Sequence, residues 1–384
     1  MNYFSSDFIL GILGGGQLGK MLLYETRKLD IYTHVLDPSN EAPCKIACNK
    51  FFKGDLLDFD TVYKFGKNVD ILTIEIENVN IEALEKLEDE GVQVYPPTKA
   101  LRTIQNKATQ KLFYTDHNIP TAPFSRFAYK SEIEDSIANG GLQFPFVWKA
   151  AQFGYDGQGV KVVRSVKDLD DLPNGECIAE DMIPFKNELA VIVARNLNGD
   201  VVTYPVVEME FHPEANQVEY VICPARIDEA VAKKATEIAL KVSNEMKHVG
   251  LLAVEMFQTK EDKILVNEVA PRPHNSGHHT IESSYTNQFE QHIRAILNLP
   301  LGNTESKVAG IMVNLVGAEG HTGDVVYENI EDILKLNGVT PHVYGKKQTR
   351  PFRKMGHVTI VNKDIDTARK IAQRVKETIK VISK

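Results

Sequence analysis

The strongest constraint on the fold is an alternation, in the first hundred residues, between short β-rich runs and amphipathic stretches. Strands are predicted at residues 8–13, 32–36 and 71–76, and helices at residues 17–28 and 81–91. Such an alternation indicates a parallel α/β domain. Pro96 and Pro97 end it, because two consecutive prolines continue neither a helix nor a central strand. The first domain is therefore predicted to span residues 1–98.

The middle of the chain is instead rich in strands joined by turns. A predicted helix at 99–117 and a proline-rich segment at 119–123 precede strands expected at residues 146–150, 160–164, 177–181, 189–195, 201–208 and 218–223. Tight turns such as 196–200 favour antiparallel pairing. A helix at 228–247, two more strands and a helix at 284–298 complete a central domain at 99–300. Residues 301–384 predict a small α+β domain with three strands and two short helices, so the fold class is multidomain α/β and α+β.

Length and charge limit the kinds of partner. A chain of 384 residues exceeds the size of one hydrophobic core. Its net charge of −8 repels polyanions, so no nucleic-acid partner is expected. No run approaches the roughly 18 apolar residues of a membrane span, and no secretory signal is recognisable. We therefore expect a cytoplasmic protein that has no membrane partner, with its four cysteines reduced.

A glycine-rich turn, Gly14 to Gly19, lies between the first predicted strand and helix and matches the dinucleotide fingerprint. Asp37 follows the second strand, roughly where an acid that binds ribose would lie. Taken alone, the turn suggests NAD. Glycines and free N–H groups at a helix N-terminus also suit another phosphate, a carboxylate or tight packing without a ligand. The turn leaves these alternatives open.

A second candidate phosphate-binding motif follows in the central domain. Lys149 ends an apolar strand and precedes a loop with three glycines, Gly154, Gly157 and Gly159. Backbone N–H groups of such a loop can close over phosphates, and the lysine adds positive charge. The alternative is a flexible hairpin tip with a solvated lysine.

Two acidic residues in a predicted hairpin suggest a cation site. If residues 259–264 form the turn, Gln258 pairs with Leu265 and Glu255 faces Glu268. Carboxylates directly opposite, with Cβ atoms about 5 Å apart, repel each other and call for a cation or a proton. Mg²⁺ favours one or two carboxylates beside phosphate oxygens, and Asn267 offers another oxygen. A register shifted by one residue would instead leave both acids solvated.

Two further segments are weaker candidates. The strand at residues 177–183 can present backbone groups to an adenine edge, and an acid shortly after it can accept hydrogen bonds from ribose hydroxyls. Near the C-terminus a cluster without acids stands out against the negative net charge and suits a monoester phosphate. It comprises Lys346, Lys347, Arg350, Arg353, Lys354 and His357. The alternative is an ordinary basic surface strip.

The order and spacing of these motifs resemble the ATP-grasp superfamily and, within it, the N5-carboxyaminoimidazole ribonucleotide synthetase family over essentially the whole chain. The segments that carry the resemblance are residues 14–19, 73–79, 154–159, 267–278 and 350–357. This family has a Rossmann-like N-terminal domain that does not use NAD, an ATP-grasp central domain and a small C-terminal domain. One departure is Phe352, which stands where glycine is common.

The resemblance implies roles for individual residues. ATP is implied to contact Lys107, Lys149, Gly154, Tyr155, Asp156, Gly157, Gln158, Gly159, Glu180, Asp181, Met182, Ile183, Glu188, His212, Asn267 and Glu268. Glu255 and Glu268 are the implied metal ligands. The implied substrate-binding residues are Gln17, Leu18, Glu75, Asn78, Tyr155, Arg272, His274, Asn275, Ser276, Lys346, Arg353 and Lys354. The implied catalytic residues are Asp156, Arg272, His274 and Lys354. The loop at 272–276 could otherwise be a solvated turn.

The implied activity is an ATP-dependent ligase of de novo purine biosynthesis. It carboxylates 5-aminoimidazole ribonucleotide with bicarbonate to N5-carboxyaminoimidazole ribonucleotide, and gives ADP and phosphate through carboxyphosphate. The implied partners are ATP as co-substrate, Mg²⁺ with Mn²⁺ as a substitute, and a second copy of the chain in a homodimer. The alternatives are another ATP-grasp carboxylate–amine ligase, a nicotinamide-dependent oxidoreductase and a non-catalytic nucleotide-binding protein.

Overall fold

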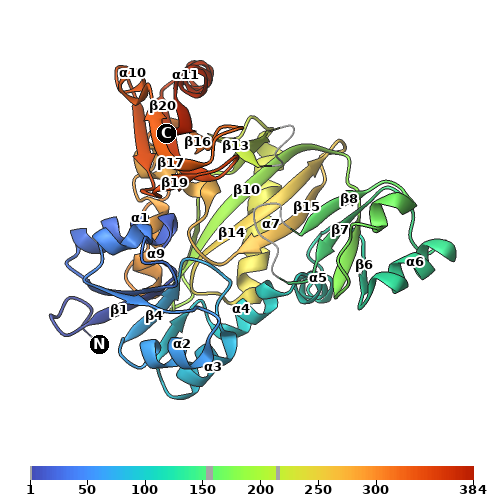
Figure 1. Cartoon of the computed structure of the whole chain (residues 1–384), viewed down its shortest axis with the longest axis horizontal. Helices are drawn as coiled ribbons and strands as arrows, with labels where there is room; N and C mark the ends of the chain where they lie inside the picture. Colours follow the sequence, from blue (N-terminus) through green and yellow to red (C-terminus); the bar gives the residue numbers. More distant parts are fainter. Residues whose placement is uncertain (1, 153–158, 213–216) are drawn as a thin grey trace.

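The computed structural model describes residues 2–152, 159–212 and 217–384, which form three sheet-based regions and a small C-terminal layer (Figure 1). Gly154, Tyr155, Asp156, Gly157 and Gln158 lie outside the described residues. Within the described residues, no helix is both long and apolar enough to cross a bilayer. The mixed α/β and α+β architecture expected from the sequence is confirmed.

The N-terminal region is a parallel sheet with the strand order β3-β2-β1-β4-β5. Its strands are β1 (Ile9–Leu13), β2 (Tyr32–Asp37), β3 (Lys50–Lys53), β4 (Ile71–Ile74) and β5 (Gln93–Tyr95). Its helices are α1 (Gln17–Lys28), η1 (Pro43–Ile46), α2 (Phe59–Gly66) and α3 (Ile81–Asp89). The predicted helix at 17–28 is confirmed, whereas β3, α2 and β5 were not anticipated. The strand order reverses between β1 and β4, and ligands of open α/β sheets commonly bind at such a switch point.

The predicted single helix at 99–117 is wrong, because two helices occupy this segment: α4 (Thr98–Gln105) and α5 (Lys107–Asp116). Asn106 separates them with extended backbone angles, and its Oδ1 accepts a hydrogen bond from the N–H of Thr109 at 2.9 Å. Asparagine favours this capping geometry over the helix interior. The cap places Lys107 at the first position of α5.

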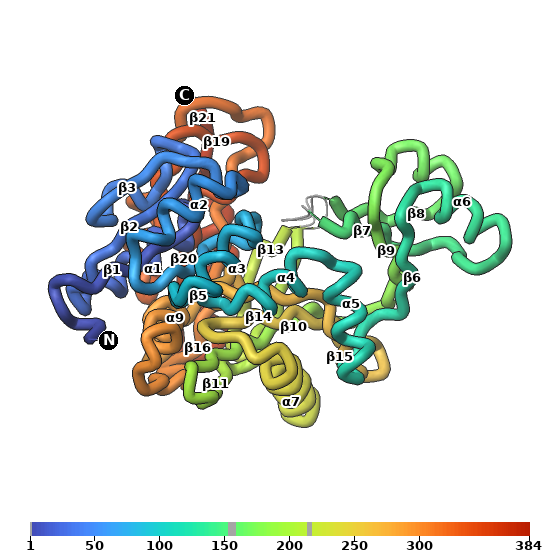
Figure 2. Tube along the Cα trace, turned by 90° about the horizontal axis from the view of Figure 1, so that it is seen from below, coloured from blue at the N-terminus to red at the C-terminus, as the bar shows by residue number. Residues whose placement is uncertain are grey.

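A four-stranded antiparallel sheet with the order β6-β9-β7-β8 forms the next layer. It contains β6 (Phe124–Phe127), β7 (Phe146–Ala150), β8 (Val160–Val163) and β9 (Cys177–Asp181), with α6 (Lys130–Ala138) and η2 (Val166–Leu169). Phe146, Trp148 and Val163 pack in its core, which is separate from the core of the larger sheet. Figure 2 shows this sheet at the opposite end of the molecule from β1 to β3.

The largest sheet has nine strands in the order β15-β14-β10-β12-β13-β16-β20-β18, with β11 paired to β10. Its strands are β10 (Phe185–Arg195), β11 (Val201–Thr203), β12 (Val207–Phe211), β13 (Val218–Cys223), β14 (Gly250–Thr259), β15 (Ile264–Ala270), β16 (Ala309–Val316), β18 (Val339–Val343) and β20 (Lys354–Asn362). The predicted strand at 201–208 is two strands. Pro205 lies between them, and proline cannot donate a hydrogen bond to a central ladder. The sheet also runs across residue 300, so the boundary proposed there stays a prediction.

Helices cover this sheet and connect it to its neighbours. They are α7 (Glu229–Met246), η3 (Asn275–Gly277), α8 (Thr280–Ser283) and α9 (Gln288–Ile296). The predicted helix at 284–298 is shorter, because Asn287 caps α9 by accepting hydrogen bonds from the N–H groups of Phe289 and Glu290. Helix α9 packs on α1, and Asn287 also donates to the buried Glu25 at 2.9 Å.

The C-terminal region has six strands where three were predicted. Besides β16, β18 and β20 it contains β17 (Gly323–Glu328), β19 (Gln348–Thr349) and β21 (Lys380–Ser383), with helices α10 (Ile330–Ile333) and α11 (Ile365–Thr378). The three unanticipated strands form a separate small sheet. Lys20 of α1 joins this region to the N-terminal sheet, because its Nζ donates to the carbonyls of Val343 and Tyr344 at 3.1 and 3.3 Å. Helix α1 and the segment that leads to Lys346 therefore lie together.

Substituting Asn106→Ala removes the cap of α5 and should lower the free energy of unfolding by about 1 kcal/mol. It also removes a hydrogen bond to Glu176. Denaturant titration of the variant measures the loss. The control is Thr103→Ala in α4, whose hydroxyl bonds only to the carbonyl of Lys99 and whose removal should change stability by less than about 0.5 kcal/mol. Equal stability of Asn106→Ala and wild type would contradict the capping role.

Candidate active site

The glycine turn after β1 is filled by carboxylates of the protein itself. Glu75 accepts hydrogen bonds from the N–H groups of Gly16 and Gly19 at 3.0 and 3.2 Å. Asp37 accepts from the N–H of Gly15 at 2.7 Å. These are the donors that would cradle a dinucleotide pyrophosphate, so a nicotinamide cofactor would have to displace both acids. Burial raises the pKa of Glu75, and the two backbone hydrogen bonds oppose that shift.

The other predicted residues of this region differ in exposure. Gln17 is the first residue of α1 and is partly exposed, and Asn78 is exposed on the loop after β4. Leu18 was predicted to bind substrate, but its side chain is only 8% exposed and packs in the core with Leu10 and Leu22. The core position leaves only the backbone of Leu18 available to a ligand, and its substrate contact stays a prediction.

Three lysines converge on two acids where the four-stranded sheet meets β15. Lys107 contacts Glu268 at 2.7 Å. Lys149 of β7 contacts Glu180 at 3.0 Å and donates to the amide oxygen of Asn267 at 2.8 Å. These contacts bring together residues from four separate stretches of the chain. The lysines predicted to bind phosphates are thus paired with acids in this structure.

Lys111 is the third lysine, and the sequence analysis missed it. It contacts Glu180 at 3.0 Å, and both side chains are almost completely buried. Burial lowers the pKa of Lys111 to about 8, while the charge of Glu180 opposes that shift. Lys107 and Lys111 are four residues apart on one helix, a spacing that places them on the same face, and this was the available signal.

Glu255 and Glu268 face each other on β14 and β15, as predicted, but the register behind this pairing was wrong. Gln258 pairs with Ile264 and not with Leu265. The register then shifts by one residue between Met256 and Glu255. A β-bulge at Asn267 supplies the extra residue that restores the Glu255–Glu268 pair, and bulges re-aim side chains in this way. The bulge also turns Asn267 toward Lys149.

The two carboxylates differ strongly in their electrostatic environment. Burial and the charge of Glu268 raise the pKa of Glu255. The ammonium of Lys107 lowers the pKa of Glu268. No group of three or more histidine, cysteine or acidic side chains suited to a metal ion occurs among the described residues. Two carboxylates and an amide oxygen nevertheless fit an ion such as Mg²⁺, which completes its coordination with phosphate oxygens and water.

Residues proposed for the adenosine end flank this centre. Glu180 is buried and forms ion pairs with Lys111 and Lys149, so its carboxylate is already bound by groups of the protein. Asp181, the last residue of β9, and Met182 are exposed, and Ile183 is partly exposed. Glu188 of β10 is largely buried, and this burial raises its pKa to about 7.

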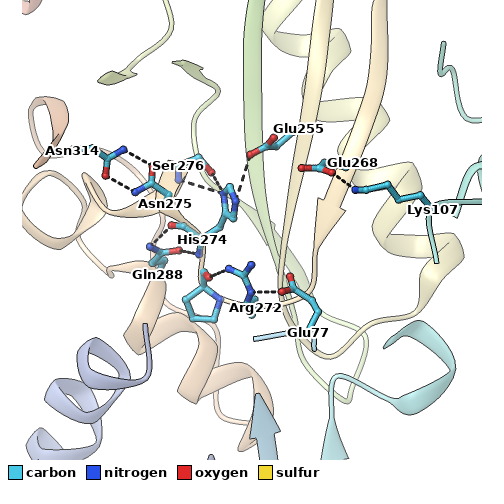
Figure 3. A network of polar contacts seen from close by, with 11 residues as sticks. Glu77, Lys107, Glu255, Glu268, Arg272, His274, Asn275, Ser276, Gln288 and Asn314 are labelled. Atoms are coloured by element: carbon cyan, nitrogen blue, oxygen red, sulfur yellow. Dashed lines mark hydrogen bonds and ion pairs between the residues drawn. The ribbon is translucent and has the colours of Figure 1, made fainter. Parts of the chain in front are cut away.

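The loop after β15 carries the predicted substrate residues on the other side of the carboxylates (Figure 3). His274 Nε2 lies 3.4 Å from Glu255, and its Nδ1 lies 2.9 Å from the Ser276 hydroxyl. The amides of Asn275 and Asn314 form two reciprocal hydrogen bonds of 2.9 Å, which tie the loop to β16. These contacts exclude the alternative of a solvated turn.

Arg272 of the same loop forms an ion pair with Glu77 at 2.8 Å (Figure 3). Glu77 follows β4, and its carbonyl accepts a hydrogen bond from the side chain of Gln105 at 2.7 Å. The sequence analysis did not assign Glu77 a role, although it lies within the motif at 73–79. The pair links the N-terminal domain to the substrate loop.

Only some of the basic residues predicted to cluster near the C-terminus lie close to one another. Lys346 donates to the carbonyl of Lys354 at 2.8 Å, and Arg353 donates to the carbonyl of Gln348 at 2.6 Å. The charge of Lys354 is among those that lower the pKa of Glu255, so Lys354 lies on the active-site side. Lys347 instead contacts Glu41 at 2.6 Å on the surface, and Arg350 is exposed.

His357 does not belong to this anion cluster, which corrects the prediction. It is completely buried, stacks on His342 at a ring-centroid distance of 4.4 Å and contacts the tilted ring of His278 at 4.6 Å. Burial holds its pKa well below the ordinary value. A neutral imidazole in this stack supplies no charge to a phosphate.

Phe352 adopts a φ of +61°, the left-handed region that bulky residues rarely enter. This backbone geometry explains why glycine suits the position. The Phe352 ring lies 5.9 Å from that of His212, and both line a pocket of 230 Å³ with Asn314. His212, predicted to contact ATP, is thus placed beside the C-terminal segment.

Three family models match consecutive parts of the chain. They describe a ribonucleotide synthetase preATP-grasp domain at residues 8–105, an ATP-grasp domain at 112–289 and a phosphoribosylaminoimidazole carboxylase C-terminal domain at 310–371. Together they follow the order of the three regions.

Relatives match over almost the whole chain. The N5-carboxyaminoimidazole ribonucleotide synthase of Bacillus subtilis is 37% identical over 93% of this chain and 92% of its own length. The chloroplastic phosphoribosylaminoimidazole carboxylase of Vigna aconitifolia is also 37% identical, but the chain spans only 65% of that longer protein.

Solved structures agree. The Thermotoga maritima N5-carboxyaminoimidazole ribonucleotide synthetase has a TM-score of 0.90 and 41% identity, covering 98% of this chain and all of that one. The Aspergillus clavatus enzyme, solved with ADP and 5-aminoimidazole ribonucleotide, has a TM-score of 0.88 and 33% identity, covering 97% and 98%. The chain therefore belongs to the N5-carboxyaminoimidazole ribonucleotide synthase family of ATP-grasp ligases.

Proposed function

We propose that this chain uses ATP and bicarbonate to carboxylate the exocyclic amine of 5-aminoimidazole ribonucleotide in purine biosynthesis. One observation carries the proposal: the Glu255–Glu268 pair separates phosphate-binding lysines on one side from the His274 loop on the other (Figure 3). An ATP γ-phosphate beside the lysines would lie next to an acceptor held by the loop. The names and ligands of the relatives support the same reaction.

The ATP end of the site rests on exchangeable ion pairs. Lys107 and Lys149 now contact Glu268, Glu180 and Asn267, and ATP phosphates would offer both lysines stronger anionic partners. Release of Lys107 frees Glu268 to act with Glu255 as a cation ligand. Mg²⁺, or Mn²⁺ in its place, would neutralise charge on the transferring phosphoryl group. Adenine and ribose would lie along residues 180–183 and Glu188.

The chemistry needs placement rather than a covalent enzyme intermediate. A bicarbonate oxygen attacks the γ-phosphorus and ADP leaves, which gives carboxyphosphate. The amine of the ribonucleotide then attacks the carboxyl carbon, phosphate leaves, and the amine loses a proton. Arg272 and the His274 loop would hold the carboxyl group, and Asp156 would close the site from the glycine loop. Exclusion of water is necessary because carboxyphosphate hydrolyses.

The ribonucleotide would lie between the N-terminal and C-terminal regions. Gln17, Glu75 and Asn78 would line one wall, and Lys346, Arg353 and Lys354 would bind its phosphate on the other. Arginine forks and lysine charges suit such a monoester. Family resemblance alone further suggests a cytoplasmic homodimer, which size-exclusion chromatography with light scattering would test.

A single assay separates the proposed reaction from its alternatives. ADP release by the purified chain should require both bicarbonate and 5-aminoimidazole ribonucleotide for full rate, because carboxyphosphate must form and be captured. The product should carry label from ¹⁴C-bicarbonate when quenched in alkali. ADP release that depends on another amine and ignores bicarbonate would point to a different ATP-grasp ligase and sink the proposal.

Glu268→Gln should abolish bicarbonate-dependent ADP release, because the neutral amide loses both the cation-ligand charge and the partner of Lys107. We expect at least a hundredfold loss of kcat, on the order of 3 kcal/mol. Circular dichroism checks that the fold persists. Glu261→Gln, in the exposed turn of the same hairpin, is the control and should retain full rate. Wild-type turnover by Glu268→Gln would disprove the assignment.

Arg353→Ala should raise the KM for the ribonucleotide and leave the KM for ATP unchanged. Loss of a charge-assisted hydrogen bond to phosphate costs about 1.5–3 kcal/mol, which corresponds to a KM increase of about ten- to a hundredfold. Steady-state kinetics with each substrate varied in turn measures both constants. Arg374→Ala, on the exposed face of α11, is the matched control. An equal loss for both substrates would rule out a phosphate anchor.

A further inference from the structure

Gln288, the first residue of α9, is completely buried and its amide makes three hydrogen bonds. Its Oε1 accepts from the backbone N–H of His274 at 2.8 Å, and its Nε2 donates to the carbonyl of the same residue at 2.8 Å. The second proton of Nε2 faces Nδ1 of His278 at 3.0 Å. One side chain thus holds both polar groups of the His274 backbone (Figure 3).

These bonds determine the protonation of His278. Both protons of the Gln288 amide are directed at acceptors, so Nδ1 of His278 must carry a lone pair, and the neutral ring holds its proton on Nε2. Burial keeps the pKa of His278 well below the ordinary value, which maintains the neutral form. The reversed amide would place donor against donor at His274. The orientation of Gln288 is therefore unique.

The backbone beside Gln288 provides the space that the amide needs. A Cβ atom added to Gly277 would lie 2.5 Å from Oε1 of Gln288 and 2.3 Å from Ile192. The hydroxyl of Thr280 accepts from the N–H of Gln288 and donates to the carbonyl of Gly277 at 3.0 and 2.6 Å. The start of α9, Gly277 and the Gln288 amide thus pack together as one buried unit.

The amide clamp has a consequence for the imidazole of His274. Nδ1 of His274 accepts from the N–H of Ser276 at 3.3 Å, so the ring proton is on Nε2, which faces Glu255 at 3.4 Å. The imidazole projects from the peptide that Gln288 holds. A rotation of that peptide would move the ring away from the carboxylate pair, and displacements near 1 Å are enough to cost about a hundredfold in rate.

We propose that Gln288 is a positioning residue of the carboxylation reaction, which clamps the His274 peptide so that the His274 imidazole is directed at Glu255 and the bound acceptor. This inference rests on the proposed function. Gln288 touches no substrate itself and acts only through His274. Groups that support a catalytic side chain in this way are typically worth about ten- to a hundredfold in activity.

The same helix offers a matched control. Gln291 is also completely buried, and its amide makes the same pair of bonds to the backbone of Gly302, with Nε2 donating at 3.1 Å and Oε1 accepting at 2.9 Å. Gly302 lies beyond α9 and is not part of the active site. Loss of either clamp should reduce stability similarly, whereas only Gln288 is connected to His274.

The experiment compares Gln288→Leu with Gln291→Leu in the full chain. Both should lower the melting temperature by similar amounts. Only Gln288→Leu should lower kcat by about ten- to a hundredfold, with the KM for ATP within about twofold of wild type. A folded Gln288→Leu with kcat within twofold of wild type, or a loss no larger than that of Gln291→Leu, overturns the proposal.

A spectroscopic readout keeps the inference testable if Gln288→Leu does not fold. The clamp requires that neutral His278 of the wild type holds its proton on Nε2, because the Gln288 amide donates to Nδ1. NMR of ¹⁵N-histidine-labelled wild type distinguishes the two tautomers, and a proton on Nδ1 would contradict the clamp. If wild type shows no carboxylation, the proposed function fails, while the tautomer of His278 still decides whether the clamp exists.

Discussion

The opposition of Glu255 and Glu268 across the β14–β15 ladder is the constraint on which the rest of the site depends. Two acids in this position are unfavourable without compensation. The protein compensates them from different sides, with Lys107 at Glu268 and the His274 imidazole at Glu255. The pair therefore connects the lysine side and the His274 side of the candidate site. Any ligand that changes the charge at one end changes the electrostatics at the other.

Compensation by internal partners also explains how lysine side chains can be buried in the absence of a nucleotide. Lys111, Lys149 and Glu180 form a buried group of two cations and one anion that holds β7 and β9 to α5. Breaking a buried pair by removing one partner is costly. The Lys111–Glu180 ion pair is therefore expected to stay intact. Lys107 is different, because its partner Glu268 is more exposed. Under the proposed function, phosphates would take over Lys107 without leaving a buried charge unpaired.

The sequence predicted the carboxylate pair and the strands and helices around it, because these follow from local patterns. It did not predict the bulge at Asn267, since a register shift leaves no mark in hydrophobic periodicity and depends on contacts such as that with Lys149. Residues that act through tertiary contacts, namely Gln288 and Glu77, were missed for the same reason. His357 was misread because charge composition does not reveal burial. The break at Asn106 and the later start of α9 at Asn287 were errors that capping preference alone could have prevented.

The N-terminal glycine turn shows how one local backbone geometry can bind different anions. Its free N–H groups bind an anion, and here that anion is the Glu75 carboxylate from the end of β4. The interaction joins the two strands at the switch point of the sheet. The turn that would bind a dinucleotide phosphate is therefore occupied by a carboxylate of the protein itself and is held rigidly. On the other side of the domain interface, Lys20 holds the backbone that leads into the basic segment at Lys346, where we propose that the ribonucleotide phosphate binds.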